Sequence, residues 1–234
     1  MSTSLYLIPS LLGETEVSRV LPNYNTSIIQ SIRLYFVEEL RTARRFLRTA
    51  GFTASFDETE LILINEHTKS EELYEFGKKL EKQTAGLISE AGLPAVADPG
   101  ASLVKIAHQK NIKVVPLVGP SSIFLALMAS GLDGQNFAFN GYLPIDKTLR
   151  IKAIQNLERK SKVDNQTQIF METPYRNNSV VEDVLQNCKG DTLFCIATNI
   201  TTDQEFIKTQ TISDWKKNKK DIHKQPAIFL IQAF

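Results

Sequence analysis

The chain has 234 residues, 42% of them hydrophobic and 23% charged, which is typical of a globular protein with one large or two small domains. Its 27 lysines and arginines nearly balance 26 aspartates and glutamates, and a net charge of +1 argues against nucleic-acid binding by bulk charge alone. Cys188 and Cys195 are too few for a disulfide scaffold and lack metal-ligand spacing, so we expect buried thiols and no metal. The start of the chain lacks the features of a signal peptide, and no apolar run reaches membrane-spanning length. We therefore expect a cytoplasmic protein with no membrane contact.

Short apolar runs alternate with helical patterns through the first half of the chain. The sequence predicts strands at 5–8, 34–37, 85–88 and 114–118, and helices at 40–50, from about 68 to 82, at 102–109 and at 122–130. A capping box formed by Thr68 and Glu71 is expected at the start of the second helix. Further strands are predicted at 168–171, 192–197, 206–211 and 227–231, more closely spaced and with a hairpin near 201–203. This order predicts two α/β domains, residues 1–117 with a mainly parallel sheet and residues 118–234 with a mixed sheet.

Three of the predicted strands lead into turns rich in small residues, at 8–13, 89–100 and 119–122. In open α/β sheets, ligands bind outside the carboxyl ends of the strands, where small residues permit close approach. Asp98 is suited to cap the following helix, and Pro99 suits its first turn. Each turn alone is better explained by ordinary loop and cap chemistry, but three in order at strand ends predict a small-molecule site. The sequence has no Gly-x-Gly-x-x-Gly, Walker or Gly-x-Ser-x-Gly motif, so the turns alone specify no reaction.

Six ordered motifs carry a resemblance to a known family. Residues 89–100 read Ser-Glu-Ala-Gly-x-Pro-x-x-x-Asp-Pro-Gly, residues 116–122 read Pro-x-x-Gly-Pro-Ser-Ser, and the others lie at 38–47, 65–68, 131–144 and 172–176. The set resembles the tetrapyrrole methylase superfamily, and within it the bacterial 16S ribosomal RNA cytidine 2′-O-ribose methyltransferases. The resemblance spans almost the whole chain. It implies two α/β domains with a cofactor cleft between them, and a homodimer.

The resemblance also implies an S-adenosylmethionine-dependent methyltransferase. Its cofactor contacts would be Pro9, Ser10, Gly92, Asp98, Pro99, Gly100, Ala101, Ser121, Ser122, Met171, Glu172, Ala197, Pro226 and Ala227. Backbone amides, carbonyls and small side chains suit a zwitterionic cofactor with a sulfonium. Methyl transfer is an in-line displacement, so alignment of the reacting atoms in a dry site supplies most of the acceleration.

The sequence departs from the ribosomal RNA enzymes in ways that bear on the methyl acceptor. Glu90 stands where they carry aspartate, Thr198–Thr202 lacks the charged ends of their Arg-Glu-Leu-Thr-Lys strand, the first loop lacks Pro-Thr-Pro-x-Gly-Asn, and no extra segment follows Phe234. Three hypotheses therefore stay open. The chain is a methyltransferase for the ribose 2′-hydroxyl of ribosomal RNA, a methyltransferase for a tetrapyrrole-like molecule or a modified protein residue, or a non-catalytic S-adenosylmethionine-binding protein.

Arginines lie on one face of the helix predicted at 40–50. Arg41, Arg44, Arg45 and Arg48 are spaced i, i+3, i+4 and i+7. Such a face is either a solvated basic surface or a set of phosphate contacts for RNA, and the resemblance favours contact with ribosomal RNA or the small subunit. Arg176 is a further candidate for phosphate binding, with an ion pair to Glu172 as the structural alternative.

The candidate catalytic bases are Glu38, which follows the strand predicted at 34–37, and the neighbouring Glu66 and His67. A ribose hydroxyl has a high pKa, so its methylation would gain from a nearby carboxylate or imidazole. Polar side chains at loop ends are also common without a catalytic role. Trp215 is interpreted as a packing anchor, with stacking on a base as the alternative.

Overall fold

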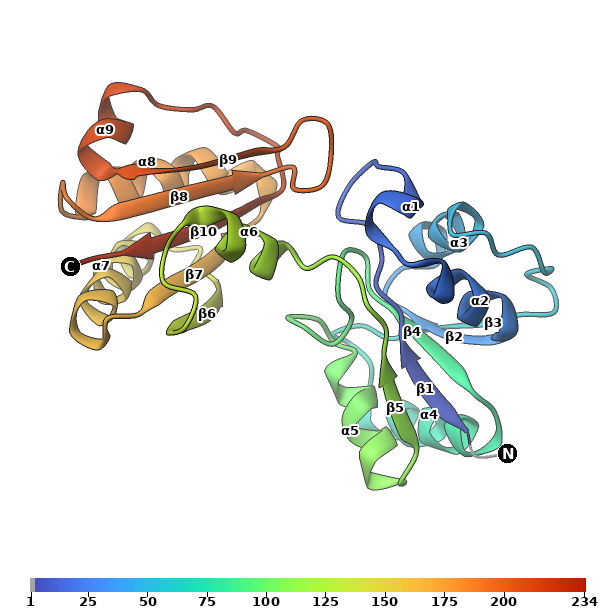
Figure 1. Cartoon of the computed structure of the whole chain (residues 1–234). Coiled ribbons are helices and arrows are strands. Elements are labelled where there is room, and N and C mark those ends of the chain that lie inside the picture. Colours follow the sequence, from blue (N-terminus) through green and yellow to red (C-terminus); the bar gives the residue numbers. More distant parts are fainter. Residues whose placement is uncertain (1–2) are drawn as a thin grey trace. The chain divides into compact units, whose positions relative to one another are not determined.

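The computed structural model describes residues 3–234, and the chain divides after Ser121 into two compact units. The division predicted from the sequence lies between 117 and 118. Each unit contains one five-stranded sheet covered by helices on both faces (Figure 1). The two-unit α/β architecture expected from the sequence is confirmed.

The sheet of the N-terminal unit is entirely parallel, as predicted. Its strands are β1 (Ser4–Leu7), β2 (Leu34–Val37), β3 (Glu60–Leu63), β4 (Ala85–Ile88) and β5 (Lys113–Pro116), in the order β3-β2-β4-β1-β5. The strand β3 was not expected from the sequence. It lies at the sheet edge with Glu60 and Leu63 exposed, so it lacks the continuous apolar run of a buried parallel strand.

Helices cover the two faces of this sheet in two groups (Figure 1). On one face, α1 (Val17–Val20), α2 (Asn23–Ser31) and α3 (Leu40–Thr49) form one core with Tyr35 and Val37; on the other, α4 (Ser70–Lys82) and α5 (Ala101–Gln109) form a second core with Leu34 and Phe36. The strand β4 lies between β1 and β2. The chain leaves β1 and β2 toward the face covered by α1, α2 and α3, whereas it leaves β4 toward the face covered by α4 and α5. The carboxyl end of β4 is therefore a topological switch point, where open α/β sheets bind ligands.

The start of α4 differs from the predicted capping box. Glu72 Oε2 accepts a hydrogen bond from the Lys69 amide at 2.9 Å, so the reciprocal contact lies one residue later than expected. The Thr68 hydroxyl instead accepts from the Asn65 amide at 2.9 Å and closes the preceding turn. The prediction of Thr68 and Glu71 as the capping pair is therefore wrong.

The sheet of the C-terminal unit is mixed, as predicted. Its strands are β6 (Phe137–Tyr142), β7 (Thr167–Glu172), β8 (Leu193–Thr198), β9 (Phe206–Thr211) and β10 (Ala227–Gln232), in the order β6-β7-β10-β8-β9. Only β6 and β7 pair in parallel, and β8 and β9 form the expected hairpin. The prediction that the strands of this half are closely spaced is wrong for β6, β7 and β8. The helix α7 (Lys147–Asp164) separates β6 from β7, and α8 (Asn177–Asn187) separates β7 from β8.

Successive side chains along the strands of this second sheet point to its two opposite faces, which are covered by different helices. Phe170, Phe194 and Phe229 stack at centroid distances of 5.5 and 5.9 Å and pack in one core with α7, α8 and α9 (Ile212–Lys217). The other face is covered by α6 (Ser122–Ser130), whose Ser130 carbonyl accepts from the Thr209 hydroxyl at 2.6 Å. Trp215 is buried and donates from Nε1 to the Phe194 carbonyl at 2.8 Å, which confirms its interpretation as a packing anchor.

Both cysteines are buried free thiols, as expected. Burial raises the pKa of Cys188 to about 12 and that of Cys195 to about 11, so neither is a thiolate at neutral pH. Within residues 3–234, none of the helices combines the length and apolar character that crossing a bilayer requires.

Candidate functional site

Two of the predicted turns form one structure at the carboxyl edge of the N-terminal sheet. The Ser10 amide donates to the Gly92 carbonyl at 2.9 Å, and the Ser10 hydroxyl donates to the Ser89 carbonyl at 3.1 Å. Ser10 is only 2% exposed. These bonds join the loop after β1 to the loop after β4 at the switch point, and thereby bring the cofactor candidates Pro9, Ser10 and Gly92 together.

The third turn packs on the first. A Cβ atom on Gly119 would lie 2.3 Å from Pro9 Cβ, a distance that only glycine avoids. Asn25 is buried in α2 and donates from Nδ2 to the Val118 carbonyl at 2.8 Å, which holds the same loop from the other side. Sequence reasoning missed Asn25, and its only local signal is a buried asparagine in a helix of mixed polarity. Ser121 follows in this loop, while Ser122 begins α6 in the C-terminal unit.

Replacing Gly119 with alanine is expected to lower the free energy of unfolding by about 1–3 kcal/mol, because the added methyl overpacks the contact with Pro9. Urea unfolding followed by far-ultraviolet circular dichroism measures the change. Gly134→Ala is the matched control, because no atom lies within 4 Å of a Cβ built there. Equal midpoints for the two variants would show that the Pro9–Gly119 contact yields without cost.

The loop after β4 holds an unusual backbone. Gly92, Ala95 and Ala97 have φ angles of +73°, +66° and +57°. Alanine rarely adopts this left-handed region, and such strained backbones concentrate at functional sites. Near the end of this loop, Asp98 Oδ1 accepts a hydrogen bond from the Gly100 amide at 2.6 Å. The helix α5 then starts at Ala101 with Gly100 as its N-cap, so Asp98 shapes the turn before the helix and does not cap its first turn as predicted.

Carboxylates gather beside this loop. Glu38, directly after β2, accepts from the Glu90 amide at 3.1 Å through Oε2, whereas its neighbour Glu39 caps α3 by accepting from the Thr42 amide. Partial burial and the charges of Glu38 and Glu39 raise the pKa of Glu90. Burial raises the pKa of Asp98 and outweighs the hydrogen bonds to its carboxylate, which lower the pKa. The negative charge of Glu38 raises the pKa of Asp98 further. The candidate base Glu38 therefore lies next to the predicted cofactor loop.

A cavity of about 390 Å³ opens in the N-terminal unit between the loop after β3 and the loop after β4. Its lining consists of Ile64, Asn65, Glu66, Thr68, Leu73, Ala97, Asp98, Pro99 and Ser102. The candidate bases Glu66 and His67 lie 3.6 Å apart with both side chains 84% exposed, but only Glu66 lines the cavity. The structure thus brings Glu66 and the cofactor candidate Asp98 to one hollow, while His67 lies outside it.

The arginine face of α3 is exposed but not uniform. Arg48 donates to the carbonyls of Phe52 and Ala54 and lies 4.4 Å from the Phe56 ring centroid, so it anchors the following loop. Arg44 lies 5.6 Å from the same ring. In the part of the chain that the structure describes, no ion pair joins any arginine of this face to a carboxylate. Arg41 and Arg45 are therefore the guanidinium groups most available to an external anion.

The cofactor candidates of the C-terminal unit lie at one end of its sheet but on two faces. Ala227 pairs with Glu172, while Ile228 pairs with Met171 and with Ala197. Pro226 precedes β10, and its carbonyl accepts from the Asn199 amide at 3.1 Å. Since successive residues of a strand point to opposite faces, Glu172 and Ala227 face α8, whereas Met171 and Ala197 face α6.

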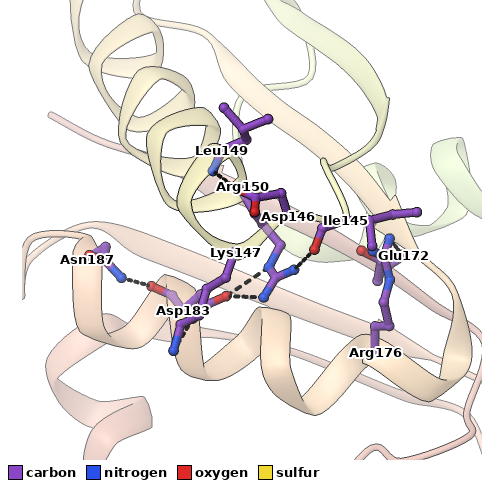
Figure 2. Close-up of polar contacts among 9 residues, drawn as sticks. All are labelled: Ile145, Asp146, Lys147, Leu149, Arg150, Glu172, Arg176, Asp183 and Asn187. Atoms are coloured by element: carbon purple, nitrogen blue, oxygen red, sulfur yellow. Dashed lines mark hydrogen bonds and ion pairs between the residues drawn. The ribbon is translucent and has the colours of Figure 1, made fainter.

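Two ion pairs lie on the α8 face (Figure 2); the pair of Arg150 and Asp183 is buried, whereas Arg176, the partner of Glu172, is partly exposed. Glu172 Oε1 accepts from the Thr173 amide and from Arg176 Nη2, so the structural alternative for Arg176 is the one observed. Arg150 donates to Asp183 Oδ2 from Nε at 2.8 Å and from Nη2 at 2.7 Å, and from Nη1 to the Ile145 carbonyl. The second pair was missed by sequence reasoning, because Arg150 and Asp183 look like ordinary surface residues of two polar helices.

Comparison with known proteins decides the family. The profile of the family described as Tetrapyrrole (Corrin/Porphyrin) Methylases matches residues 27–215. The chain belongs to the tetrapyrrole methylase family. This methylase is 29% identical to the "Ribosomal RNA small subunit methyltransferase I" of Vibrio cholerae, over 98% of the chain and 77% of that protein. It is 31% identical to the protein of the same name from Halalkalibacterium halodurans, over 88% and 67%.

The solved structure of the methyltransferase CobJ matches this methylase with a TM-score of 0.62 at 14% identity, over 99% of the chain and 94% of that structure. At this identity the likeness concerns the fold, and it agrees with one parallel and one mixed sheet. Family and relatives together make the chain an S-adenosylmethionine-dependent methyltransferase. The roles assigned above to single residues stay predictions.

Proposed function

We propose that this methylase transfers a methyl group to a ribose 2′-hydroxyl of small-subunit ribosomal RNA, with a cytidine as the target nucleoside. The observation that carries the proposal is the exposed arginine face of α3, where neither Arg41 nor Arg45 lies within ion-pair distance of a carboxylate among the described residues. Guanidinium groups match phosphate oxygens in geometry and charge. The names of the relatives that match most of the chain support the same acceptor.

The loops at the carboxyl edge of the N-terminal sheet fit the methyl donor. Ser10, Gly92 and Ala101 are small, so the loops that carry them would allow a cofactor with an adenosine and a methionine group to approach the backbone closely. S-adenosylmethionine supplies an electrophilic methyl group on a sulfonium. Glu38 and Glu66 are the candidates to accept the proton of the ribose hydroxyl, whose oxygen would take the methyl group while S-adenosylhomocysteine leaves.

Incubation with radiolabelled S-adenosylmethionine and separate pools of ribosomal RNA, protein and small molecules tests the acceptor. Label in a ribose 2′-O-methyl group of small-subunit RNA is the expected result. Label only in the protein or small-molecule pool would overturn the RNA proposal and assign the site to a different acceptor. The expected homodimer and the cytoplasmic location stay predictions of the sequence.

Reversing two charges on the arginine face should weaken RNA binding selectively. Arg41→Glu combined with Arg45→Glu removes two phosphate contacts, so the slope of log affinity against log salt should fall by about two. Affinity for S-adenosylhomocysteine should stay unchanged. Fluorescence anisotropy with a labelled ribosomal RNA fragment at several salt concentrations measures the slope.

The control for net charge is Lys152→Glu combined with Lys160→Glu, two exposed positions on α7. This variant changes the total charge by the same amount and should keep the wild-type slope. If both double variants lose the same affinity, RNA responds to total charge and the α3 face is an ordinary solvated surface.

A further inference from the structure

We propose that the cavity beside Asp98 is the subsite for the nucleoside whose ribose is methylated, with its hydroxyl and amino groups directed at the carboxylates in the wall. The inference rests on the proposed function and adds to it a location and a recognition chemistry. It starts from the lining of the cavity, which combines Glu66 and Asp98 with Asn65, Thr68 and Ser102.

The polar wall favours ligands that donate hydrogen bonds. No lysine or arginine lines the cavity, while two carboxylates do. Asp98 Oδ1 and Asn65 Oδ1 already accept from backbone amides, whereas the Glu66 carboxylate contacts, among residues 3–234, only the exposed His67, at 3.6 Å. The Glu66 carboxylate is therefore a free acceptor, and a phosphate placed here would be repelled. Ribose hydroxyls and the exocyclic amine of cytosine are neutral donors that suit such a wall.

The remaining wall is apolar and gives a base a surface to lie on. Ile64, Leu73, Ala97 and Pro99 supply this part of the lining. At about 390 Å³ the cavity falls within the range of small-molecule sites, which are typically about 300–1,000 Å³. A nucleoside presents a flat apolar face and a polar edge, so it matches both parts of the lining.

The position of the cavity fits an RNA chain that also reaches the arginine face. The Ile64 amide donates to the Val37 carbonyl at 2.9 Å, so β2 and β3 end side by side. The segment after β3 forms part of the cavity wall, and the segment after β2 leads into α3. Phosphates would meet Arg41 and Arg45 while the nucleoside enters a hollow without cationic side chains. Asp98 belongs both to this wall and to the predicted cofactor loop, which places the acceptor beside the donor.

The test compares cytidine with cytidine 5′-monophosphate as probes, using amide chemical shifts of the full-length protein. Cytidine should bind the wild type at least as well as the monophosphate and shift the signals of Glu66, Thr68 and Ser102. Glu66→Lys should reverse this preference, because it replaces a repelling charge with an attracting one at the cavity. Glu71→Lys, on the exposed start of α4 outside the lining, should leave the preference as in the wild type.

A second variant blocks the cavity by volume. Ser102→Phe should raise the KM for ribosomal RNA about tenfold or more and abolish the cytidine shifts, while S-adenosylhomocysteine affinity stays within about twofold. Cytidine shifts that persist in Ser102→Phe, or that lie elsewhere in the wild type, would overturn the proposal. Wild-type protein that binds cytidine in the cavity but methylates no RNA would instead refute the proposed function and leave a nucleoside site.

Discussion

Replacing Asp183 with alanine is expected to lower the free energy of unfolding of the C-terminal unit by about 3–5 kcal/mol. The substitution leaves the Arg150 guanidinium buried without its counter-ion, since the two side chains are 8% and 4% exposed. It also frees the start of α7 from α8, because Arg150 bridges Asp183 and the Ile145 carbonyl. Trp215 is the only tryptophan and lies in the core of this unit, so its fluorescence in urea follows the relevant transition.

The matched controls separate the buried pair from general charge effects. Lys147 also lies 3.9 Å from Asp183 but is 69% exposed, so Lys147→Ala should change stability by less than about 0.5 kcal/mol. The combined variant Arg150→Met and Asp183→Leu should regain most of the lost stability, because it buries no unpaired charge. A loss below about 1 kcal/mol in Asp183→Ala would mean that water reaches Arg150 and that the pair contributes little.

Replacing Ala101 with tryptophan is expected to weaken S-adenosylhomocysteine binding about 100-fold or more and to reduce methyl transfer accordingly. Ala101 begins α5 directly after the Asp98 turn, and its side chain is exposed. A bulky indole at this position would occupy the space assigned to the cofactor without disturbing the core. Calorimetry with S-adenosylhomocysteine measures the affinity, and the melting temperature without ligand reports on the fold.

The same insertion one helical turn later serves as the control. Lys105 is exposed on α5, so Lys105→Trp should retain wild-type affinity and show the usual rise in melting temperature when ligand is added. If Ala101→Trp also binds normally while folded, the predicted contacts at Asp98–Ala101 are misplaced. If the wild-type protein itself shows no binding heat, the cofactor prediction fails for all of these loops.

The sequence predicted correctly those helices and strands whose own residues show a clear apolar pattern with polar residues or turns at both ends. The runs at β2, β4 and β9 were predicted with the bounds that the structure has, because each is an apolar or β-branched segment bounded by polar residues or turns. The helix α6 was also predicted with its bounds, since Gly131 follows it with a φ of +71° and ends it.

Other elements depend on contacts that sequence alone does not reveal. The strand β6 contains Asn140 and Gly141, which disfavour a strand, yet Asn140 is held by bonds to the Gln168 side chain and the Ile169 carbonyl of β7. The buried pair of Arg150 and Asp183 likewise exists only because α7 and α8 meet. Asn65 lay in a motif noted in the sequence and Ser102 in a predicted helix, but neither was given a site role, because without strand β3 the sequence does not show that their loops line one cavity.

The position of β10 constrains how the protein is made. This strand comprises residues 227–232, yet it lies in the middle of its sheet, paired on one side with β7 and on the other with β8. During synthesis, β7 and β8 therefore expose unpaired edges and apolar side chains until residues 227–232 have left the ribosome. The parallel sheet of the other unit is complete once residue 116 has emerged. Nascent chains should thus acquire protease resistance in two steps, and the second should come only after residue 232 has emerged.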